Sequence, residues 1–335
     1  MSPRPIVLAL LVAGVLAPAA DATGGPALAA DRSPRNGIQI RLVDAPVKAR
    51  ADSRAWRYII DHLAPGSVIH RRVEVSNTTG SPRHLSLYPA AGEIRGGKFQ
   101  FAPGRTPDEL STWTAMSHRE LTLGPHARSM VMTTITVPDD AAPGERYAVI
   151  WAETAAPAPR GGGVAEVNRV GVRVYLSVGR GNPPPSDFTI DSITPQRSPG
   201  GQQIVEAQVH NTGGRALDLA GDMRLTHGPG SLRAGPFKVQ SGTTLLPGDS
   251  RPVTVVLGEQ VPNGPWRARL RLESGLTRRT AEATITFPIT MGTADAVKAE
   301  TGTNYYGLAA LVIVAALCVL LAVRFLGNRG SGSRP

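Results

Sequence analysis

Apolar and polar residues alternate with a period of two along most of the chain. The clearest run is 170–178, in which valine or leucine occupies every second position between Gly171, Arg173, Tyr175 and Ser177. A period of two places successive side chains on opposite faces of a β-strand. No long apolar run with a helical period of 3.6 residues occurs before the C-terminal end. The pattern predicts an all-β protein and a strand at 170–178 with one buried face.

Shorter runs of the same kind follow between glycine and proline residues. Runs at 131–137 and 147–151 predict strands, and the second of these has apolar residues on both faces, as expected of a central strand. Gly96-Gly97 separates two apolar pieces, 93–94 and 99–101, and predicts a hairpin with a two-residue turn.

A break at 181–186, with the sequence GNPPPS, divides these runs into two series. Three successive prolines cannot pair in a sheet, so this segment is predicted to be a stiff linker. The second series contains alternating runs at 205–209, 253–257, 266–272 and 281–287. A single large β-domain would not need such a break. We therefore expect two tandem immunoglobulin-like β-sandwiches, at 37–180 and 187–290.

The two series also repeat a local pattern. Pro65-Gly66 is followed twelve residues later by Asn77-Thr78, and Pro199-Gly200 is followed at the same interval by Asn211-Thr212. Each interval spans one strand between two turns, because Pro-Gly begins a turn and Asn-Thr supplies its local hydrogen bonds. The repeat favours two similar domains.

The N-terminus has the pattern of a secretory signal peptide. Arg4 precedes an apolar run at 6–17, which is too short to span a bilayer. Small residues follow, with two possible cleavage sites, near Ala22 or near Ala29. We assign 1–30 to the signal peptide and leave the choice of site open.

The C-terminus has the pattern of a membrane anchor. After a polar stalk at 291–303, the segment 304–326 contains 17 consecutive residues, 307–323, without charge, and Tyr305 and Tyr306 lie where interfacial aromatics are common. The tail at 327–335 carries arginines and no acidic residue, which places it in the cytoplasm. We expect a single-pass plasma-membrane protein whose N-terminal ectodomain lies outside the cell.

The exported part has no cysteine, because Cys318 lies in the predicted span. Its stability must then come from packed cores rather than disulfides. Residues 31–303 contain 32 Arg and Lys and 25 Asp and Glu, a net charge of +7. Such a charge favours anionic wall polymers or lipid head groups as partners, while the exported topology argues against nucleic acid.

Catalytic and metal-binding patterns are absent from the sequence. It contains no G-x-S-x-G, H-E-x-x-H or P-loop motif, and its seven histidines are scattered without ligand spacing. We therefore expect no metal, no cofactor and no enzyme activity.

Three groups of residues are candidates for ligand binding. The first is Arg54, Trp56, Arg57 and Tyr58, which combine ring faces with guanidinium groups and could hold a sugar carboxylate. The alternative is that Trp56 and Tyr58 fill the core while both arginines are solvated.

The second candidate is Trp113, in a polar segment at 102–119 that is long for a hairpin loop; it could equally fill the core. The third is Arg267, Arg269 and Arg271, which alternate along one strand and could form an anion-binding face. A solvated sheet face is the ordinary alternative.

Four segments carry a family resemblance: 37–42 (GIQIRL), 58–62 (YIIDH), 73–78 (VEVSNT) and 142–149 (APGERYAV). Together they resemble the WxL-interacting cell-surface family of Gram-positive bacteria, over residues 37–178. The resemblance implies a signal peptide, a first immunoglobulin-like domain credited with peptidoglycan binding, a second credited with binding host or surface partners, and a C-terminal span. It assigns no individual binding residue.

The sequence thus predicts a non-catalytic, membrane-anchored surface protein that binds cell-wall peptidoglycan, an anionic wall polymer or a wall-associated protein. Two alternatives stay open. The chain could be an accessory subunit that pairs with another exported protein, or a wall hydrolase or peptidase.

Overall fold

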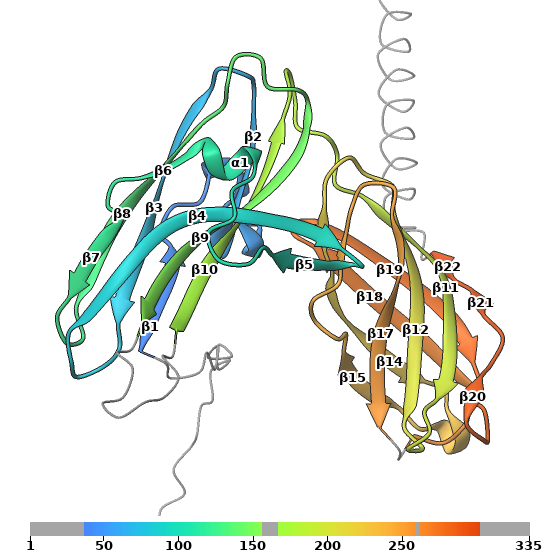
Figure 1. Ribbon diagram of the computed structural model, residues 1–335. Helices are drawn as coiled ribbons and strands as arrows, with labels where there is room; N and C mark the ends of the chain where they lie inside the picture. The colour runs from blue at the N-terminus through green and yellow to red at the C-terminus, as the bar shows by residue number, and fades with distance from the viewer. Residues whose placement is uncertain (1–36, 156–166, 259–260, 302–335) are drawn as a thin grey trace, which may run out of the picture. The chain divides into compact units, whose positions relative to one another are not determined.

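The computed structural model describes residues 37–155, 167–258 and 261–301. Within these ranges nearly every regular element is a β-strand, and the helices are short turns such as α1 (Glu109–Thr112). The strands form two β-sandwiches, each with its own hydrophobic core (Figure 1). The predicted all-β class and the presence of two β-sandwiches are confirmed.

The first sandwich follows from alternating segments packed face to face. Its elements are β1 (Ile38–Leu42), η1 (Val47–Ala49), η2 (Ser53–Trp56), β2 (Ile59–Leu63), β3 (Val68–Asn77), β4 (Arg83–Arg95), β5 (Lys98–Phe101), α1, β6 (Thr114–Met116), β7 (Glu120–Leu123), β8 (Arg128–Thr136), β9 (Gly144–Ala155) and β10 (Val167–Val178). One sheet has the order β1-β3-β8-β6 and the other β2-β10-β9-β4-β5, with β7 paired to β4. Strand β2 runs parallel to β10, and the other pairs are antiparallel.

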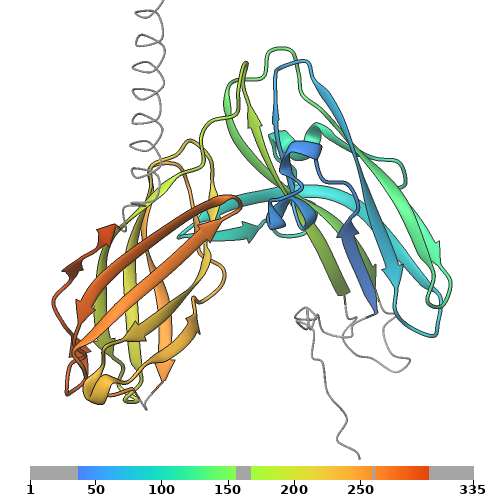
Figure 2. The ribbon, with the colours of Figure 1, turned by 180° about the vertical axis from the view of Figure 1, so that it is seen from behind.

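The second sandwich is built in the same way. Its elements are β11 (Phe188–Arg197), β12 (Gln203–Asn211), β13 (Leu217–Asp218), β14 (Ala220–Thr226), η3 (Pro229–Ser231), β15 (Ala234–Lys238), β16 (Thr244–Leu245), β17 (Ser250–Gly258), β18 (Trp266–Ser274), β19 (Thr277–Ile285), β20 (Gly292–Thr293), β21 (Val297–Lys298) and β22 (Glu300–Thr301). The sheet β15-β14-β18-β19-β22 packs its apolar face against the sheet that contains β17, β12 and β11 (Figure 2).

Two buried asparagines occupy equivalent places in the sandwiches, as the sequence repeat predicts. Asn77 ends β3 and Asn211 ends β12, and both are at most 2% exposed. Each side-chain amide donates to the backbone carbonyl four residues later, at 2.8 and 2.9 Å. Each also donates to a distant carbonyl, that of Leu123 for Asn77 and that of Leu245 for Asn211. One residue type therefore satisfies the buried turn in both domains.

The hairpin predicted at Gly96-Gly97 is present between β4 and β5. Both glycines have positive φ, +61° and +74°, which a type I′ turn requires. Strand β10 is also where the alternation predicts it, but the expectation of one buried face is wrong. Tyr175 and Ser177, on the supposedly exposed face, are 3% and 1% exposed. A second apolar cluster covers that face of the sheet.

The second sandwich extends further than its alternation indicates. Residues 291–303 were expected to form a stalk, but β20 and β21 pair with β11, and β22 pairs with β19. These strands are two residues long, so period-two alternation cannot reveal them. Val297 of β21 and the buried Ala299, between β21 and β22, pack against the core. Residues 179–187, which include the predicted linker, contain no strand.

Both predicted chain ends, the signal peptide at 1–30 and the segments 304–326 and 327–335, lie outside the described residues. Among the residues that are described, no helix is long and apolar enough to cross a membrane.

Candidate ligand-binding surface

The second apolar cluster lies on the outer face of the sheet β2-β10-β9-β4-β5. In it, Tyr88 of β4 lies directly opposite Trp151 of β9, and Trp151 lies directly opposite Gly171 of β10. A Cβ atom at residue 171 would come within 2.7 Å of the Trp151 ring. The missing side chain therefore leaves room for the indole ring beside the backbone of β10. We call Tyr88 and Trp151 the aromatic floor.

Two arginines lie on this floor. The guanidinium carbon of Arg105 is 4.4 Å from the centroid of the Tyr88 ring, and that of Arg169 is 4.5 Å from the centroid of the Trp151 ring. Both arginine side chains are exposed. A guanidinium stacked on a ring keeps its N–H edges free to bind a carboxylate or phosphate in its plane.

Neither arginine has an acidic partner. Among the described residues, no carboxylate lies within ion-pair distance of Arg105 or Arg169. Arg173, two residues after Gly171 on β10, differs from them. It also lies on an aromatic ring, but it is half-buried. Its guanidinium group donates to the Tyr175 hydroxyl and lies 3.7 Å from Asp218. Arg173 is therefore a structural residue, whereas Arg105 and Arg169 present two unpaired positive charges.

Glu153, which lies directly opposite Arg169 on β9, forms a hydrogen bond rather than an ion pair. Glu153 accepts a short hydrogen bond from the Tyr88 hydroxyl. Burial and this hydrogen bond raise the pKa of the Tyr88 phenol, so it stays protonated and donates. The bond fixes the Tyr88 ring as a platform for Arg105.

The floor also contains an unused donor. Trp151 is 5% exposed, and its Nε1–H has no hydrogen-bond partner among the described residues. A buried indole N–H without a partner is costly, at about 1–3 kcal/mol. The part of this site that a ligand can reach is the pair of exposed guanidinium groups, which lie on the two buried rings. Such a set suits a sugar or peptide that carries a carboxylate.

The first group of predicted residues is not brought together on one surface. Arg54 is mostly buried, forms an ion pair with Asp52 at 3.1 Å and donates to Ser274 at 3.1 Å. Trp56 is 46% exposed and donates its indole N–H to the Arg50 carbonyl.

Arg57 is exposed. Tyr58 packs against Tyr175, with ring centroids 5.6 Å apart. The alternative, in which both aromatics fill the core, therefore holds in part for Tyr58 and not for Trp56.

Trp113 packs partly into the core of the first sandwich and supports a guanidinium on its other side. The guanidinium of Arg146 lies 4.9 Å from its ring centroid and is held by Glu109 at 2.8 Å. The segment 102–119 is not a plain loop, since it contains α1 and β6. Helix α1 begins at a capping box made by Asp108 and Ser111.

Arg267, Arg269 and Arg271 lie on the outer face of β18, with side chains 57%, 63% and 52% exposed. The structure brings these three together as the alternation predicts. It does not bring them together with the residues of the first sandwich named above.

Sequence reasoning did not identify Tyr88, Arg105, Trp151 or Arg169 as site residues. Trp151 lies in the strand at 147–151, which was predicted to be central, so burial of both faces of that strand was expected. The pairing of Tyr88 with Trp151 depends on strand register, which a single sequence does not give. Within the described ranges, no cluster of His, Cys, Asp and Glu could hold a metal ion.

No protein-family model and no curated protein matches the chain. Solved structures that resemble it include the YadV chaperone, with a TM-score of 0.40, 10% identity and coverage of 74% of this chain and 100% of that one. The Salmonella enterica complex of SafA pilin with the SafB chaperone has a TM-score of 0.39 and 11% identity, over 78% of this chain and 94% of that one. The CupB2 chaperone of Pseudomonas aeruginosa has a TM-score of 0.37 and 13% identity, over 68% of this chain and 97% of that one. Likenesses at this level say nothing about what this protein binds.

Proposed function

We propose that this chain is a non-catalytic protein of the bacterial cell surface that binds carboxylate groups of cell-wall peptidoglycan on its first sandwich. The observation that carries the proposal is the aromatic floor with its two exposed, unpaired guanidinium groups, Arg105 and Arg169. Peptidoglycan carries carboxylates on its stem peptides, and the two exposed guanidinium groups offer planar donors that the buried rings of the floor hold in place.

Other features support the same proposal. The sequence pattern predicts export and membrane anchoring, and the first sandwich covers the segments that resemble the WxL-interacting family. The ectodomain is basic, and the sequence contains no recognised catalytic motif. Membrane anchoring would hold the first sandwich outside the cell, within reach of the wall.

The test uses the purified full chain in detergent, sedimented with peptidoglycan sacculi that have been stripped of anionic polymers. The Arg105→Gln/Arg169→Gln variant should lose at least about tenfold in apparent affinity, because each charge-assisted hydrogen bond contributes about 1.5–3 kcal/mol. The matched control is Arg50→Gln/Arg57→Gln, which removes two exposed charges from the same sandwich.

The control should bind like the parent protein. Equal losses in both variants would mean that net charge alone drives binding. No retention of the parent protein would contradict the proposal and favour a protein partner, as expected of an accessory subunit.

A further inference from the structure

The outer face of the sheet β15-β14-β18-β19-β22 contains an unfavourable charge arrangement. Arg224 of β14 lies directly opposite Arg269 of β18, and Arg271 is two residues further along β18. Like charges directly opposite each other on neighbouring strands destabilise a sheet. Acidic residues offset part of this repulsion, because Arg269 also lies directly opposite Glu282 of β19 and Arg271 lies directly opposite Asp222 of β14.

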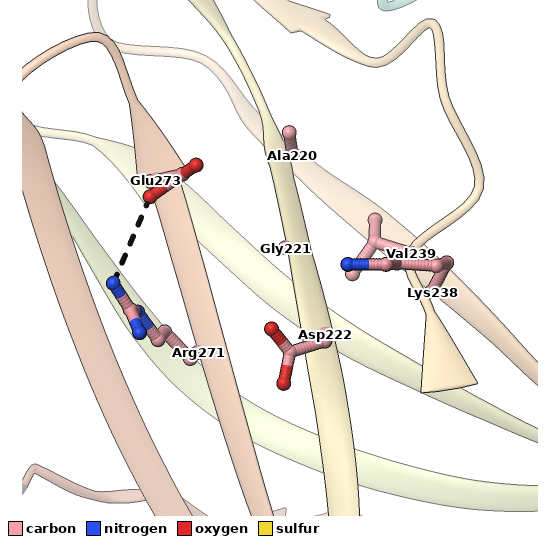
Figure 3. Close-up of a pocket in the computed structure, with 7 residues that line it drawn as sticks. All are labelled: Ala220, Gly221, Asp222, Lys238, Val239, Arg271 and Glu273. Atoms are coloured by element: carbon pink, nitrogen blue, oxygen red, sulfur yellow. Dashed lines mark ion pairs between the residues drawn. The ribbon is translucent and has the colours of Figure 1, made fainter. Parts of the chain in front are cut away.

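The three arginines surround a groove. A cavity of about 310 Å³ is lined by Arg224, Arg269 and Arg271 together with Asp222 and Thr280. A second groove of about 310 Å³ adjoins it, shares Asp222 and Arg271, and adds Lys238 and Glu273. Figure 3 shows this second groove, with the Arg271–Glu273 ion pair on one side of Asp222 and Lys238 on the other. Together, the residues that line the two grooves come from β15, β14, β18 and β19.

The three guanidinium groups in the first groove are incompletely paired. Their nearest carboxylates are Asp222 at 3.7 Å from Arg224, Glu282 at 3.5 Å from Arg269, and Glu273 at 4.0 Å from Arg271. None of the three donates a hydrogen bond to a protein group within the described part of the chain.

Their neighbours on the same sheet face behave differently. Arg267 donates to Glu282 at 2.8 Å, and Arg278 donates to Glu273 at 3.2 Å. The donors that stay free are therefore those that line the groove.

We infer that this groove binds a phosphate group, as a second ligand site distinct from the aromatic floor. Three guanidinium groups from two strands and the hydroxyl of Thr280 surround one space. Donors arriving from several directions match the tetrahedral oxygens of a phosphate better than the two coplanar oxygens of a carboxylate. A bound phosphate would also offset the repulsion between Arg224 and Arg269. Phosphate esters of wall polymers and of lipid head groups share this chemistry.

Asp222 limits the affinity of the site. Its carboxylate lines both grooves and would repel a bound phosphate. It also partly neutralises the positive charge of Arg224, which is 3.7 Å away. Asp222→Asn should therefore bind phosphate several-fold more tightly than the parent protein. A residue with a purely structural role would give no gain in affinity.

The first experiment titrates inorganic phosphate into the purified full chain in detergent and follows binding by calorimetry. Arg224→Gln should weaken phosphate binding by at least about tenfold. Without phosphate, its unfolding midpoint should stay close to that of the parent protein, because the substitution removes both the like-charge pair with Arg269 and the long ion pair with Asp222. The control Arg251→Gln removes one partly exposed charge from β17, on the opposite sheet, and should bind normally.

Absence of phosphate binding by the parent protein, or equal losses in Arg224→Gln and Arg251→Gln, would overturn the inference. The Arg105→Gln/Arg169→Gln variant should keep its phosphate affinity, so failure of the two sites is distinguishable.

Two competitors identify the source of the phosphate. Displacement of phosphate by soluble poly(glycerol phosphate) would assign a wall polymer, and displacement by phosphatidylglycerol micelles would assign a lipid head group. Displacement by neither would contradict a site for phosphate esters.

Discussion

The guanidinium group of Arg169 lies on the ring of Trp151, although the residue directly opposite Arg169 on the neighbouring strand is Glu153. An exposed cation–π contact and an exposed ion pair each contribute only about 0.5–1 kcal/mol, so neither geometry dominates by itself. Because Glu153 already accepts a hydrogen bond from Tyr88, stacking of Arg169 on Trp151 is favoured over an ion pair with Glu153. The stacked geometry leaves those N–H groups of Arg169 that do not interact with the Tyr88 hydroxyl available to a ligand.

Stacking makes Arg169 different from a simple positive charge. Arg169→Lys keeps the charge but loses the planar group that stacks and binds a carboxylate through two N–H donors. We expect sacculus retention to fall several-fold in this variant. Arg57→Lys, on the same sandwich, should have no effect. Full retention by Arg169→Lys would contradict planar recognition.

Gly171 controls the position of the Trp151 ring. A methyl group at residue 171 would lie within 2.7 Å of both the Trp151 ring and Val149. Gly171→Ala should therefore destabilise the protein by about 1–3 kcal/mol, change tryptophan fluorescence and weaken binding to sacculi. Gly80→Ala is the control, because no atom lies within 4 Å of its added carbon. Unchanged fluorescence in Gly171→Ala would contradict this packing.

The two buried asparagines should be equally sensitive to substitution. Asn77→Ala and Asn211→Ala each remove a buried hydrogen bond, to the carbonyl of Leu123 or of Leu245, which should cost about 1–3 kcal/mol in the free energy of unfolding. Denaturant unfolding of the purified protein measures the change. Asn182→Ala, at an exposed position between the sandwiches, should leave the unfolding midpoint unchanged. If only one of the two substitutions, Asn77→Ala or Asn211→Ala, lowered the free energy of unfolding, the repeated motif would differ between the domains.

The Arg41–Glu74 ion pair gives a prediction for acid pH. Two hydrogen bonds from Arg41, with the nearby charge of Arg128, lower the pKa of the Glu74 carboxyl. A lowered pKa stabilises the fold above the unfolded-state value of about 4.3, and this contribution disappears as the pH falls through the folded-state pKa.

Glu74→Gln should therefore be less stable than the parent protein at pH 7, by up to about 1 kcal/mol because Arg41 is largely exposed. The two proteins should converge as the pH falls through the lowered pKa of Glu74 in the folded state, by the same linkage. The control Glu93→Gln, which breaks an exposed pair with Arg95, should show little change at either pH. A constant difference for Glu74→Gln at all pH values would exclude the ionised pair as its cause.

Much of the fold could be predicted from alternation alone. The runs around Val131, Val174, Val205 and Leu270 all became strands whose apolar residues fill a core, because burial on one face dictates a period of two. Strands β20 to β22 could not be foreseen, because two residues are too short to show a period.

The candidate surface was less accessible to sequence reasoning. Arg267, Arg269 and Arg271 share one strand, so alternation was sufficient to group them. Arg105 and Arg169 are 64 positions apart in the sequence and come together only through strand register and through the space left by Gly171. The first candidate group, around Trp56, does not share one surface, because Arg54 forms an ion pair with Asp52 while Trp56 is exposed.

The central claim is that Arg105 and Arg169 hold carboxylates of peptidoglycan. The most direct measurement is retention of the full chain on stripped sacculi before and after their carboxylates are converted to methylamides. We predict that methylamidation lowers retention to the level of Arg105→Gln/Arg169→Gln on untreated sacculi, and that this variant loses nothing further on treated sacculi. Undiminished retention of the parent protein on methylamidated sacculi would contradict the claim.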